Sequence, residues 1–387
     1  MGDDGTRHHG VGPVNIVHVT PYLAEEMAYQ ENLLPEGQAL LGHDVTIITG
    51  VNQPDFGFNS DSRRRQAGSV AYGNCTLVRL DHYWEFTNRA PVLKSLYAEI
   101  ARRRPDILFI HDVGAALVVG VWYKRRNPEV VLHFDCHSDF KNARTSRLGP
   151  AYHGFFRMLF RSCGDMFDRV FAVAPETVEF LRQVYGVPEK RITLLPLPGD
   201  ASRIRESQAI RARVRTELGF AQHQRLLIHT GKLPGDKLTL TVLEMFRELR
   251  DQDYRLLVAG DISQSFRGTF DSFLAADDRI SYLGWVSAER LRELFMASDL
   301  LLAPGSLSNT FIDAICSGTP VLLDDTPQGR FLTGWGNGTT HPRGTHLDLL
   351  AAVKGCMDDD SLDRMRERAR KAADHLDYRN IAKLSLE

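Results

Sequence analysis

Two lysines in one short stretch are the residues best suited to bind phosphate. They lie in His229-Thr-Gly-Lys-Leu-Pro-Gly-Asp-Lys237, between a predicted strand and an amphipathic helix predicted over 239–249. A strand-to-helix loop that contains glycines can present backbone N–H groups and a helix N-terminus to phosphate oxygens, and lysines add positive charge. We therefore expect Gly231, Lys232 and Lys237 to bind a diphosphate. A surface turn with solvated lysines is the alternative interpretation.

Two carboxylates in the same half could act beside these lysines. Asp261 ends the apolar run Leu256-Leu-Val-Ala-Gly-Asp261. It is expected at the rim of a cleft, where capping a helix is favoured over positioning a neighbouring loop. Asp313 is predicted one turn inside a helix, where it could accept hydrogen bonds from ribose hydroxyls or serve only as a structural cap. The polar loop before it could donate to phosphate or ribose oxygens through Ser308, Asn309 and Thr310.

Four polar residues at predicted strand ends are candidates in the first half of the chain: His111, Asp112, Asp135 and His137. Either His111 or His137 could contact a ligand. In the alternative interpretation, Asp135 and His137 pair only with each other.

The elements that must position these residues follow from the pattern of apolar runs. Short runs rich in Val, Ile and Leu alternate with amphipathic segments of helical length, which predicts parallel strands joined by helices. In the first half, strands are predicted at Val14–Thr20, Asp44–Thr49, Thr76–Leu80, Ile107–His111, Val130–Asp135, Val170–Val173 and Ile192–Leu195. In the second half, they are predicted at Arg225–Thr230, Arg255–Ala259, Ile280–Gly284, Leu300–Ala303 and Pro320–Leu323. The fold class is therefore α/β, with two Rossmann-like, doubly wound sheets.

The length of 387 residues favours two domains. The stretch Pro196-Leu-Pro-Gly-Asp200 interrupts regular structure and marks a boundary near residue 199. We expect a tail over 1–13, an N-terminal domain over 14–198, and a C-terminal domain over 199–370. Residues 371–387 should form a helix that packs back toward the N-terminal domain. Open α/β sheets bind ligands at the carboxyl ends of their strands, so two facing domains would form one cleft.

Composition excludes several classes of function. The formal net charge of −2 gives no reason to expect a nucleic-acid partner. The five cysteines are scattered without a CxxC spacing, which argues against a disulfide framework and a zinc site. No apolar run reaches the roughly 18 residues of a membrane span, and the polar first thirteen residues do not resemble a signal peptide. A soluble cytoplasmic protein is the simplest expectation.

Three basic clusters in the first half, at 63–65, 102–104 and 124–126, raise the possibility of peripheral contact with anionic lipids at the inner face of a membrane. Solvated helix ends are the commoner explanation for such clusters.

The chemistry-bearing segments, taken in order, resemble the C-terminal domain of the retaining GT-B-fold glycosyltransferases of family 4, also called glycosyl transferases group 1. The resemblance covers about residues 225–325 and includes the lysine stretch, Gly260-Asp261, Tyr282-Leu-Gly-Trp-Val286 and Ser317-Gly-Thr-Pro-Val321. The first half resembles the same family more loosely, through its predicted first strand, first helix and second strand.

The resemblance implies a role for each matched residue. Lys232 lies where the family has its phosphate-binding arginine, and Lys237 matches the family's lysine. Val286 lies where family members hold the nucleobase through the backbone. Asp313 matches the glutamate that contacts the ribose. His137 is favoured over His111 as the match to a histidine that contacts the donor sugar, because Asp135-Cys-His-Ser138 resembles that motif more closely.

Three features depart from the family pattern. Lysine replaces arginine at 232, which keeps the charge but loses the bidentate hydrogen bonds that a guanidinium can donate to a phosphate. The segment from Pro304 to Asp313 is about three residues shorter than its family counterpart and lacks the first glutamate, so its serine, asparagine and threonine residues would take over that role. The loop 21–29 contains no glycine, although the family often has two there.

The resemblance implies metal-independent transfer of a sugar, with retention, from a nucleoside diphosphate sugar to a saccharide, lipid-linked or small-molecule acceptor. No cofactor beyond the donor is expected. Lys232, Lys237 and helix N-termini would stabilise the charge that develops on the leaving diphosphate. The alternatives are a nucleotide-sugar epimerase of the same architecture, which would need paired acids, and a catalytically silent donor-binding or scaffold protein.

Overall fold

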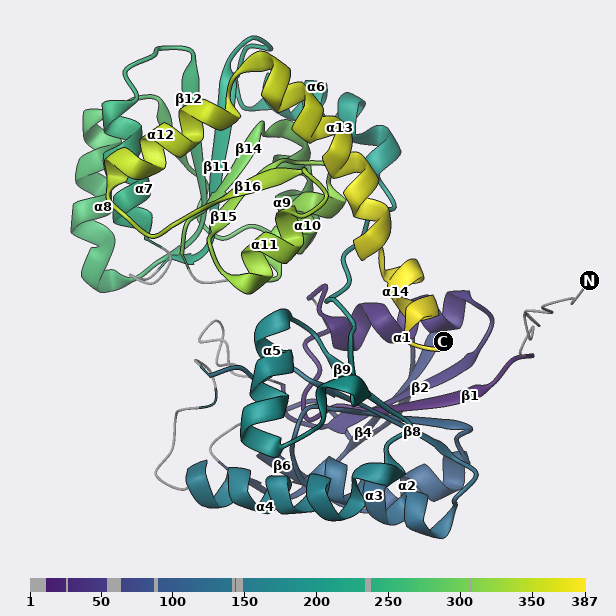
Figure 1. The fold of residues 1–387 in the computed structure, drawn as a ribbon. Helices are drawn as coiled ribbons and strands as arrows, with labels where there is room; N and C mark the ends of the chain where they lie inside the picture. Colours follow the sequence, from purple (N-terminus) through teal and green to yellow (C-terminus); the bar gives the residue numbers. More distant parts are fainter. Residues whose placement is uncertain are drawn as a thin grey trace, which may run out of the picture. The chain divides into compact units, whose positions relative to one another are not determined.

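The computed structural model describes residues 12–25, 27–53, 64–86, 90–140, 143, 149–233, 238–305 and 308–387. The chain divides into two compact units. Unit 1 holds the chain up to residue 25, residues 34–195 and the last three residues, 385–387. Unit 2 holds the segment that ends at Leu33 and residues 196–384. Each unit is built around its own parallel sheet (Figure 1), which confirms the predicted α/β class.

The sheet of unit 1 has the strand order β10-β9-β8-β7-β1-β2-β4-β3, in which only β3 runs antiparallel to its neighbour. Its strands are β1 (Asn15–Val19), β2 (Asp44–Gly50), β3 (Gly68–Tyr72), β4 (Cys75–Leu80), β7 (Ile107–His111), β8 (Val131–Cys136), β9 (Arg169–Ala172) and β10 (Ile192–Leu194). A separate hairpin is formed by β5 (His82–Phe86) and β6 (Ala90–Leu93). The strand order reverses between β1 and β7, so a ligand crevice is expected at their carboxyl ends.

The helices of this part of the chain connect successive strands. They are α1 (Gln30–Leu40), α2 (Leu96–Arg103), α3 (Ala115–Arg126), α4 (Gly149–Cys163) and α5 (Pro175–Phe180). The central strands are almost wholly apolar and buried, as in β7, where Leu108, Phe109 and Ile110 are fully buried. This two-sided burial is what a parallel sheet covered by helices requires.

The sheet of unit 2 is parallel throughout, with the order β13-β12-β11-β14-β15-β16. Its strands are β11 (Arg225–Leu233), β12 (Tyr254–Ile262), β13 (Ile280–Tyr282), β14 (Leu300–Ala303), β15 (Val321–Asp324) and β16 (Gly338–His341). Its helices are α6 (Ser207–Glu217), α7 (Thr239–Glu248), α8 (Gln264–Ala276), α9 (Ala288–Ala297), α10 (Thr310–Cys316), α11 (Pro327–Thr333), α12 (His346–Cys356), α13 (Asp359–Leu376) and α14 (Tyr378–Leu384). None of the described helices is both long and apolar enough to cross a membrane.

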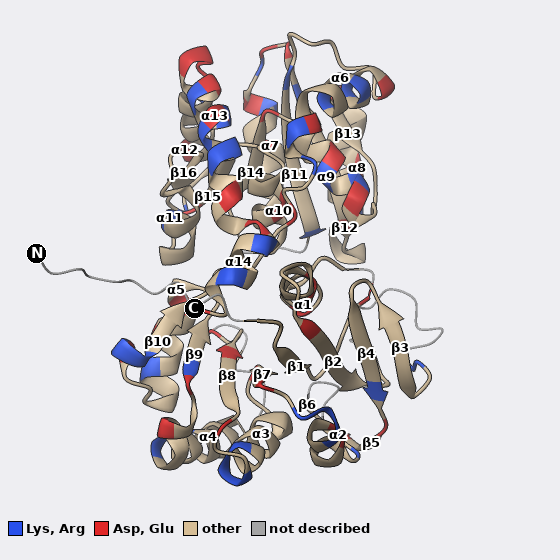
Figure 2. Cartoon of the chain, turned by 90° about the vertical axis from the view of Figure 1, so that its right-hand side faces the viewer, with Lys and Arg blue, Asp and Glu red and all other residues tan. Residues whose placement is uncertain are grey.

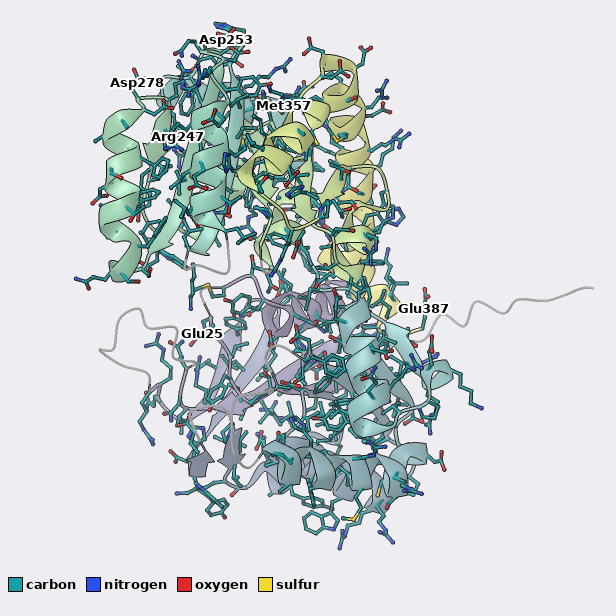
Figure 3. All side chains as sticks on the ribbon, turned by 60° about the vertical axis from the view of Figure 1, so that its left-hand side comes forward. Glu25, Arg247, Asp253, Asp278, Met357 and Glu387 are labelled. Carbon is teal, nitrogen blue, oxygen red and sulfur yellow. The ribbon has the colours of Figure 1, made fainter. Side chains whose placement is uncertain are left out.

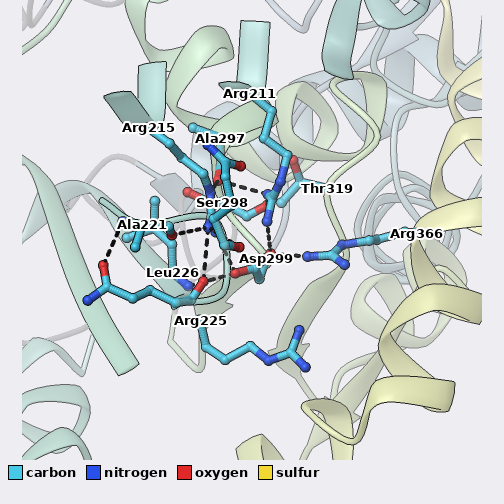
Figure 4. A network of polar contacts seen from close by, with 12 residues as sticks. Arg211, Arg215, Ala221, Arg225, Leu226, Ala297, Ser298, Asp299, Thr319 and Arg366 are labelled. Atoms are coloured by element: carbon cyan, nitrogen blue, oxygen red, sulfur yellow. Dashed lines mark hydrogen bonds and ion pairs between the residues drawn. The ribbon is translucent and has the colours of Figure 1, made fainter. Parts of the chain in front are cut away.

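An ionic cluster connects three elements of unit 2 (Figure 4). Asp299, immediately before β14, is fully buried and pairs with Arg211 and Arg215 of α6 and with Arg366 of α13. Arg215 is itself fully buried, and it also donates to the backbone carbonyl of Ala297 at the end of α9. The cluster therefore holds α6, α9 and α13 against the start of β14.

The last residues of the chain are part of unit 1. Ser385 is buried and accepts a hydrogen bond from Gln38 of α1 at 2.9 Å. The backbone carbonyl of Glu387, which is labelled in Figure 3, accepts a hydrogen bond from Arg169. These two contacts attach the end of the chain to α1 and β9.

Candidate active site

Lys232 and Asp261 lie side by side at the carboxyl ends of β11 and β12. They are partners in the parallel register, and both are exposed. The sequence predicted a loop here, but β11 continues through Gly231 and Lys232 to Leu233. The two strands approach closely at Gly231 and Gly260, because a Cβ atom on Gly260 would lie 1.8 Å from the carbonyl oxygen of Gly231. The pairing of β11 with β12 can therefore continue past this point only because residue 260 is glycine.

The preferred interpretation of Asp261 as a helix cap is wrong. Asp261 lies inside β12, and Ser263 is the residue that precedes α8. Because the strand extends past Gly260, the carboxylate remains on the exposed strand end next to Lys232. It is available there to position a lysine or a bound ligand.

The loop that carries Val286 is tied to the end of β12. The Gly260 N–H donates to the carbonyl of Gly284 at 2.8 Å, and the Tyr282 hydroxyl donates to the carbonyl of Gly260 at 2.9 Å. The side chain of Val286 packs on the core of unit 2. Ser287 then caps α9 by accepting from the Arg290 N–H at 3.2 Å.

The polar loop before α10 is internally bonded. The hydroxyls of Ser308 and Thr310 lie 2.5 Å apart, and Asn309 occupies the capping position without a side-chain bond to the helix. Asp313 is the fourth residue of α10, as expected, and is partly exposed. Lys237 and Ser306, which belong to the predicted site, lie outside the described residues.

The carboxyl of Asp313 lies in an unusual electrostatic environment. Its pKa is raised to about 7, mainly because the carboxyl is buried; Arg292 opposes the rise and Asp200 adds to it. Arg292 and Asp200 themselves form an ion pair at 3.2 Å. Burial and the charges of Glu31 and Asp313 also raise the pKa of Tyr29, which belongs to unit 2. At neutral pH, Asp313 can therefore either donate or accept a hydrogen bond.

In unit 1, two histidines converge on one buried carboxylate at the carboxyl ends of β7 and β8. Asp135 is fully buried and contacts His111 Nδ1 at 2.8 Å through Oδ2 and His137 Nε2 at 3.3 Å through Oδ1. Burial acts to raise the pKa of Asp135, but His111 and His137 outweigh it and hold the pKa below its usual range. Asp135 does pair with His137, but it also pairs with His111, so the alternative interpretation, in which Asp135 and His137 pair only with each other, is wrong. The contact with Asp135 also fixes the orientation of the partly exposed His137 ring.

A third histidine extends this group into the core. His18 of β1 contacts His111 Nε2 through Nδ1 at 2.8 Å and the side-chain oxygen of Gln38 through Nε2 at 2.6 Å. Its ring stacks on Phe109 and on His111. Sequence reasoning missed His18 and Gln38. The available signal was a histidine inside the otherwise apolar strand Asn15–Val19.

The donor atoms of His111, Asp135 and His137 all lie within 4.8 Å of one another, a spacing that could hold a metal ion. The atoms that would bind a metal ion already have partners within the protein. Both ring nitrogens of His111 have partners, one in Asp135 and one in His18. Both carboxylate oxygens of Asp135 face a histidine nitrogen. We interpret the group as a polar network in which His111 makes hydrogen bonds to His18 and Asp135, and His137 makes an ion-pair contact with Asp135.

A mostly apolar hollow opens at the β1–β7 reversal of unit 1. Its lining includes Thr20 after β1, Pro91 and Leu96 near the hairpin and α2, and His111 and Asp112 after β7. Asp112 has a left-handed backbone, with φ of 60°, and burial raises the pKa of its carboxyl. The hollow thus combines apolar walls with one acidic group, at the place where this fold class binds ligands.

Two of the three basic clusters of unit 1, those at 102–104 and 124–126, lie at helix C-termini (Figure 2). Arg102 and Arg103, in the last turn of α2, both pair with Glu99. Lys124, in the last turn of α3, pairs with Asp168. Positive charges at a helix C-terminus are favoured by the helix dipole, so these residues agree with the interpretation of the clusters as solvated helix ends. The third cluster does not lie at a helix end: Arg64 pairs with Asp81, Arg65 pairs with Glu25, and Arg63 lies outside the described residues.

Two family models match successive parts of the chain: Glycosyltransferase Family 4 over residues 32–203 and Glycosyl transferases group 1 over residues 224–359. D-inositol 3-phosphate glycosyltransferase of Nocardia farcinica is 32% identical over 222 residues, which are 52% of this chain and 48% of that protein. Mannosylfructose-phosphate synthase of Agrobacterium fabrum is 24% identical over 62% of this chain and 52% of its own length. The chain thus spans about half the length of these curated relatives.

A glycosyltransferase from Rickettsia africae has the same fold, with a TM-score of 0.73 at 14% identity over 97% of each chain. The two matched models indicate the family, and the structural likeness shows the fold. The chain belongs to the GT-B-fold glycosyltransferases of family 4.

Proposed function

We propose that this protein transfers a sugar from a nucleoside diphosphate sugar to a hydroxyl acceptor, with retention at the anomeric carbon and without a metal ion. The observation that carries the proposal is the exposed pair of Lys232 and Asp261 at the carboxyl ends of β11 and β12. The pair lies in the unit whose sequence matches the glycosyl transferases group 1 model. A cation at this edge of a parallel sheet suits a diphosphate leaving group.

Donor recognition is proposed to involve four further parts of unit 2. The backbone around Val286 is held in place by the hydrogen bonds of Gly260 and Gly284, and it would contact the nucleobase. Asp313 would contact the ribose. Ser308, Asn309 and Thr310 would contact the phosphate or the sugar. Lys237 would add a second cation, as the resemblance implies.

On unit 1, we propose that His137 contacts the donor sugar. Its Nε2 atom faces the ionised Asp135, so the ring is held in one orientation before the substrate arrives. The nearby hollow is proposed to take part of the acceptor, and its apolar lining favours an acceptor with an apolar portion, such as a lipid-linked saccharide or a small natural product.

The test replaces Lys232 by alanine. Because Lys232 is exposed at a strand end, the free energy of unfolding should change by less than about 0.5 kcal/mol. Turnover of the best donor should fall by about 100-fold, because one charge contact to the leaving group is lost. Lys371→Ala is the matched control, since that exposed lysine pairs with Glu367 on α13. Equal turnover in the two variants would remove the phosphate role of Lys232.

A second assay tests metal independence and retention together. Transfer is followed in the presence and absence of a strong chelator, and the anomeric configuration of the product is determined by NMR. We expect unchanged rates with the chelator and a product with the donor's configuration. Loss of activity on chelation, or an inverted product, would contradict the corresponding part of the proposal.

A further inference from the structure

A chain of polar side chains runs through the interior of unit 1 and ends at His137. It links Ser385, Gln38, His18, His111, Asp135 and His137 in that order. All of them except His137 are at most 2% exposed. Polar groups so deeply buried must satisfy one another, so each contact has a definite donor and acceptor.

The direction of the first links follows from Gln38. Its amide nitrogen donates to the Ser385 hydroxyl at 2.9 Å, and its amide oxygen lies 2.6 Å from His18 Nε2. An amide oxygen only accepts, so His18 Nε2 carries a proton. Burial and the neighbouring His111 lower the pKa of His18 to about 3, so the ring is neutral. Its Nδ1 therefore has a lone pair and accepts from His111 Nε2 at 2.8 Å.

The opposite nitrogen of His111 faces an acceptor as well. Nδ1 lies 2.8 Å from Asp135 Oδ2, and an ionised carboxylate can only accept. His111 must then carry a proton on both nitrogens. We infer that His111 is a buried imidazolium, ion-paired with Asp135, and that this pair is the device that fixes the proton of His137 on Nε2.

One competing arrangement satisfies the same contacts. If the Gln38 amide were rotated by half a turn, His18 would donate through Nδ1, and His111 would be neutral with a single proton. That arrangement removes the charge of the buried His111, 2.8 Å from Asp135, and leaves the partly exposed His137, 3.3 Å away, as the cationic partner of the fully buried carboxylate. A buried carboxylate without a closely paired cation is strongly unfavourable. The shorter and more deeply buried contact therefore favours the imidazolium at His111.

This inference assigns His111, His18 and Gln38 as positioning residues. They act on His137 through Asp135 and need not touch a substrate. The protonation of His111 stands independently of any enzymatic activity, whereas its effect on turnover rests on the proposed role of His137.

The direct test is heteronuclear NMR on the full chain with isotope-labelled histidines. We expect two N–H groups on the ring of His111 and one, on Nε2, in His18. His133 is the internal control, because it is buried in β8, burial lowers its pKa to about 4, and it should show a single N–H. Resonances are assigned with His111→Asn and with His133→Gln.

Two results would overturn the inference. One is a single N–H on His111 together with a proton on Nδ1 of His18. The other is a change of the His111 resonances when a strong chelator is added, since that would place a metal ion between His111, Asp135 and His137.

The functional consequence is tested with Gln38→Met, which removes the acceptor for His18 at nearly the same side-chain volume. We expect His111 to lose one proton and kcat to fall by about tenfold, the equivalent of one hydrogen bond, with a smaller effect on the donor KM. An NMR change without a kinetic change would remove the positioning role but leave the imidazolium in place. Full activity of His137→Ala would instead contradict the proposed role of His137, and the NMR result would still hold.

Discussion

At the scale of single residues, Asp313 differs from an ordinary aspartate in the pKa of its carboxyl. Its carboxyl has a pKa raised to about 7, first through burial and then through Asp200, despite the opposing charge of Arg292. A group with this pKa is partly protonated at neutral pH, so it can contact a ribose hydroxyl as donor or acceptor. The shift also means that ionisation of Asp313 destabilises the fold.

Replacing Asp313 by asparagine should therefore stabilise the protein in a pH-dependent way. The folded pKa lies above the unfolded value, so the penalty of ionisation is nearly absent at about pH 4, grows until about pH 7 and is constant above it. We expect Asp313→Asn to raise the free energy of unfolding by more than about 1 kcal/mol at about pH 8 and by little at low pH. Urea unfolding at several pH values measures this. A gain that does not depend on pH would contradict the assigned shift.

The same variant separates stability from function. We expect weaker donor binding above about pH 7, where Asp313 is ionised, because the amide cannot accept from two hydroxyls as a carboxylate does, and a smaller difference at low pH. Unchanged donor affinity would show that Asp313 is a structural residue.

At the scale of elements, the ionic cluster around Asp299 joins α6, α9 and α13 to the sheet of unit 2. Burial tends to raise the pKa of Asp299, but Arg211, Arg366 and Arg215 outweigh it and lower the pKa. The carboxylate thus stays charged and balances the positive charge of the guanidinium groups.

Removing this carboxylate should destabilise the protein strongly. Asp299→Asn would leave the fully buried Arg215 without its counter-charge, and we expect a loss of about 3–5 kcal/mol in the free energy of unfolding. The control is Asp363→Asn, because Asp363 also pairs with Arg366 but lies at the surface, and its loss should cost less than about 1 kcal/mol. If denaturant titrations showed equal losses of unfolding free energy in the two variants, the buried cluster would not stabilise the fold more than a surface ion pair does.

The close approach of β11 and β12 gives a second prediction at this scale. Gly260→Ala should disrupt the strand ends that carry Lys232 and Asp261, because the new Cβ would meet the Gly231 carbonyl and φ is 144°. Gly268→Ala on α8 meets no atom within 4 Å and should be neutral or stabilising by about 0.5–1 kcal/mol. Thermal unfolding compares the two. Similar melting temperatures would mean that the strand ends tolerate a side chain at 260.

Apolar patterning predicted the buried strands well, because strands such as Ile107–His111 and Leu300–Ala303 are continuous apolar runs. It could not predict β16 (Gly338–His341), whose residues are mostly polar, or the exposed edge strand β3. Apolar patterning also could not predict that β11 continues through Gly231, because glycine weakens a strand. The strand continues there only because its partner Gly260 lets the two backbones approach closely. For the same reason, the role of Asp261 was misjudged.

At the candidate site, the sequence predicted residues that lie at strand ends, including His111, Asp135 and His137. It could not predict that His18 and Gln38 complete the network. Their partners are far away in the chain, and Gln38 meets Ser385 across 347 positions. Contacts of this kind depend on the order of the strands in space, which local patterns do not determine.

At the scale of the whole molecule, the chain combines two units, each with its own parallel sheet and its own polar residues at the strand ends. Unit 2 carries Lys232, Asp261 and Asp313, which suit a nucleotide. Unit 1 carries the histidine network and the apolar hollow. This division of groups matches the two family models found along the chain.

The central claim is that the protein uses a nucleoside diphosphate sugar as donor. The most direct measurement is isothermal titration calorimetry with a panel of such sugars, followed by an assay of nucleoside diphosphate release with and without acceptors. We predict that at least one donor binds, that its diphosphate is released slowly in water and faster with an acceptor, and that Lys232→Ala weakens both. Binding without any release would indicate a donor-binding protein, and no binding by any member of the panel would contradict the proposed function.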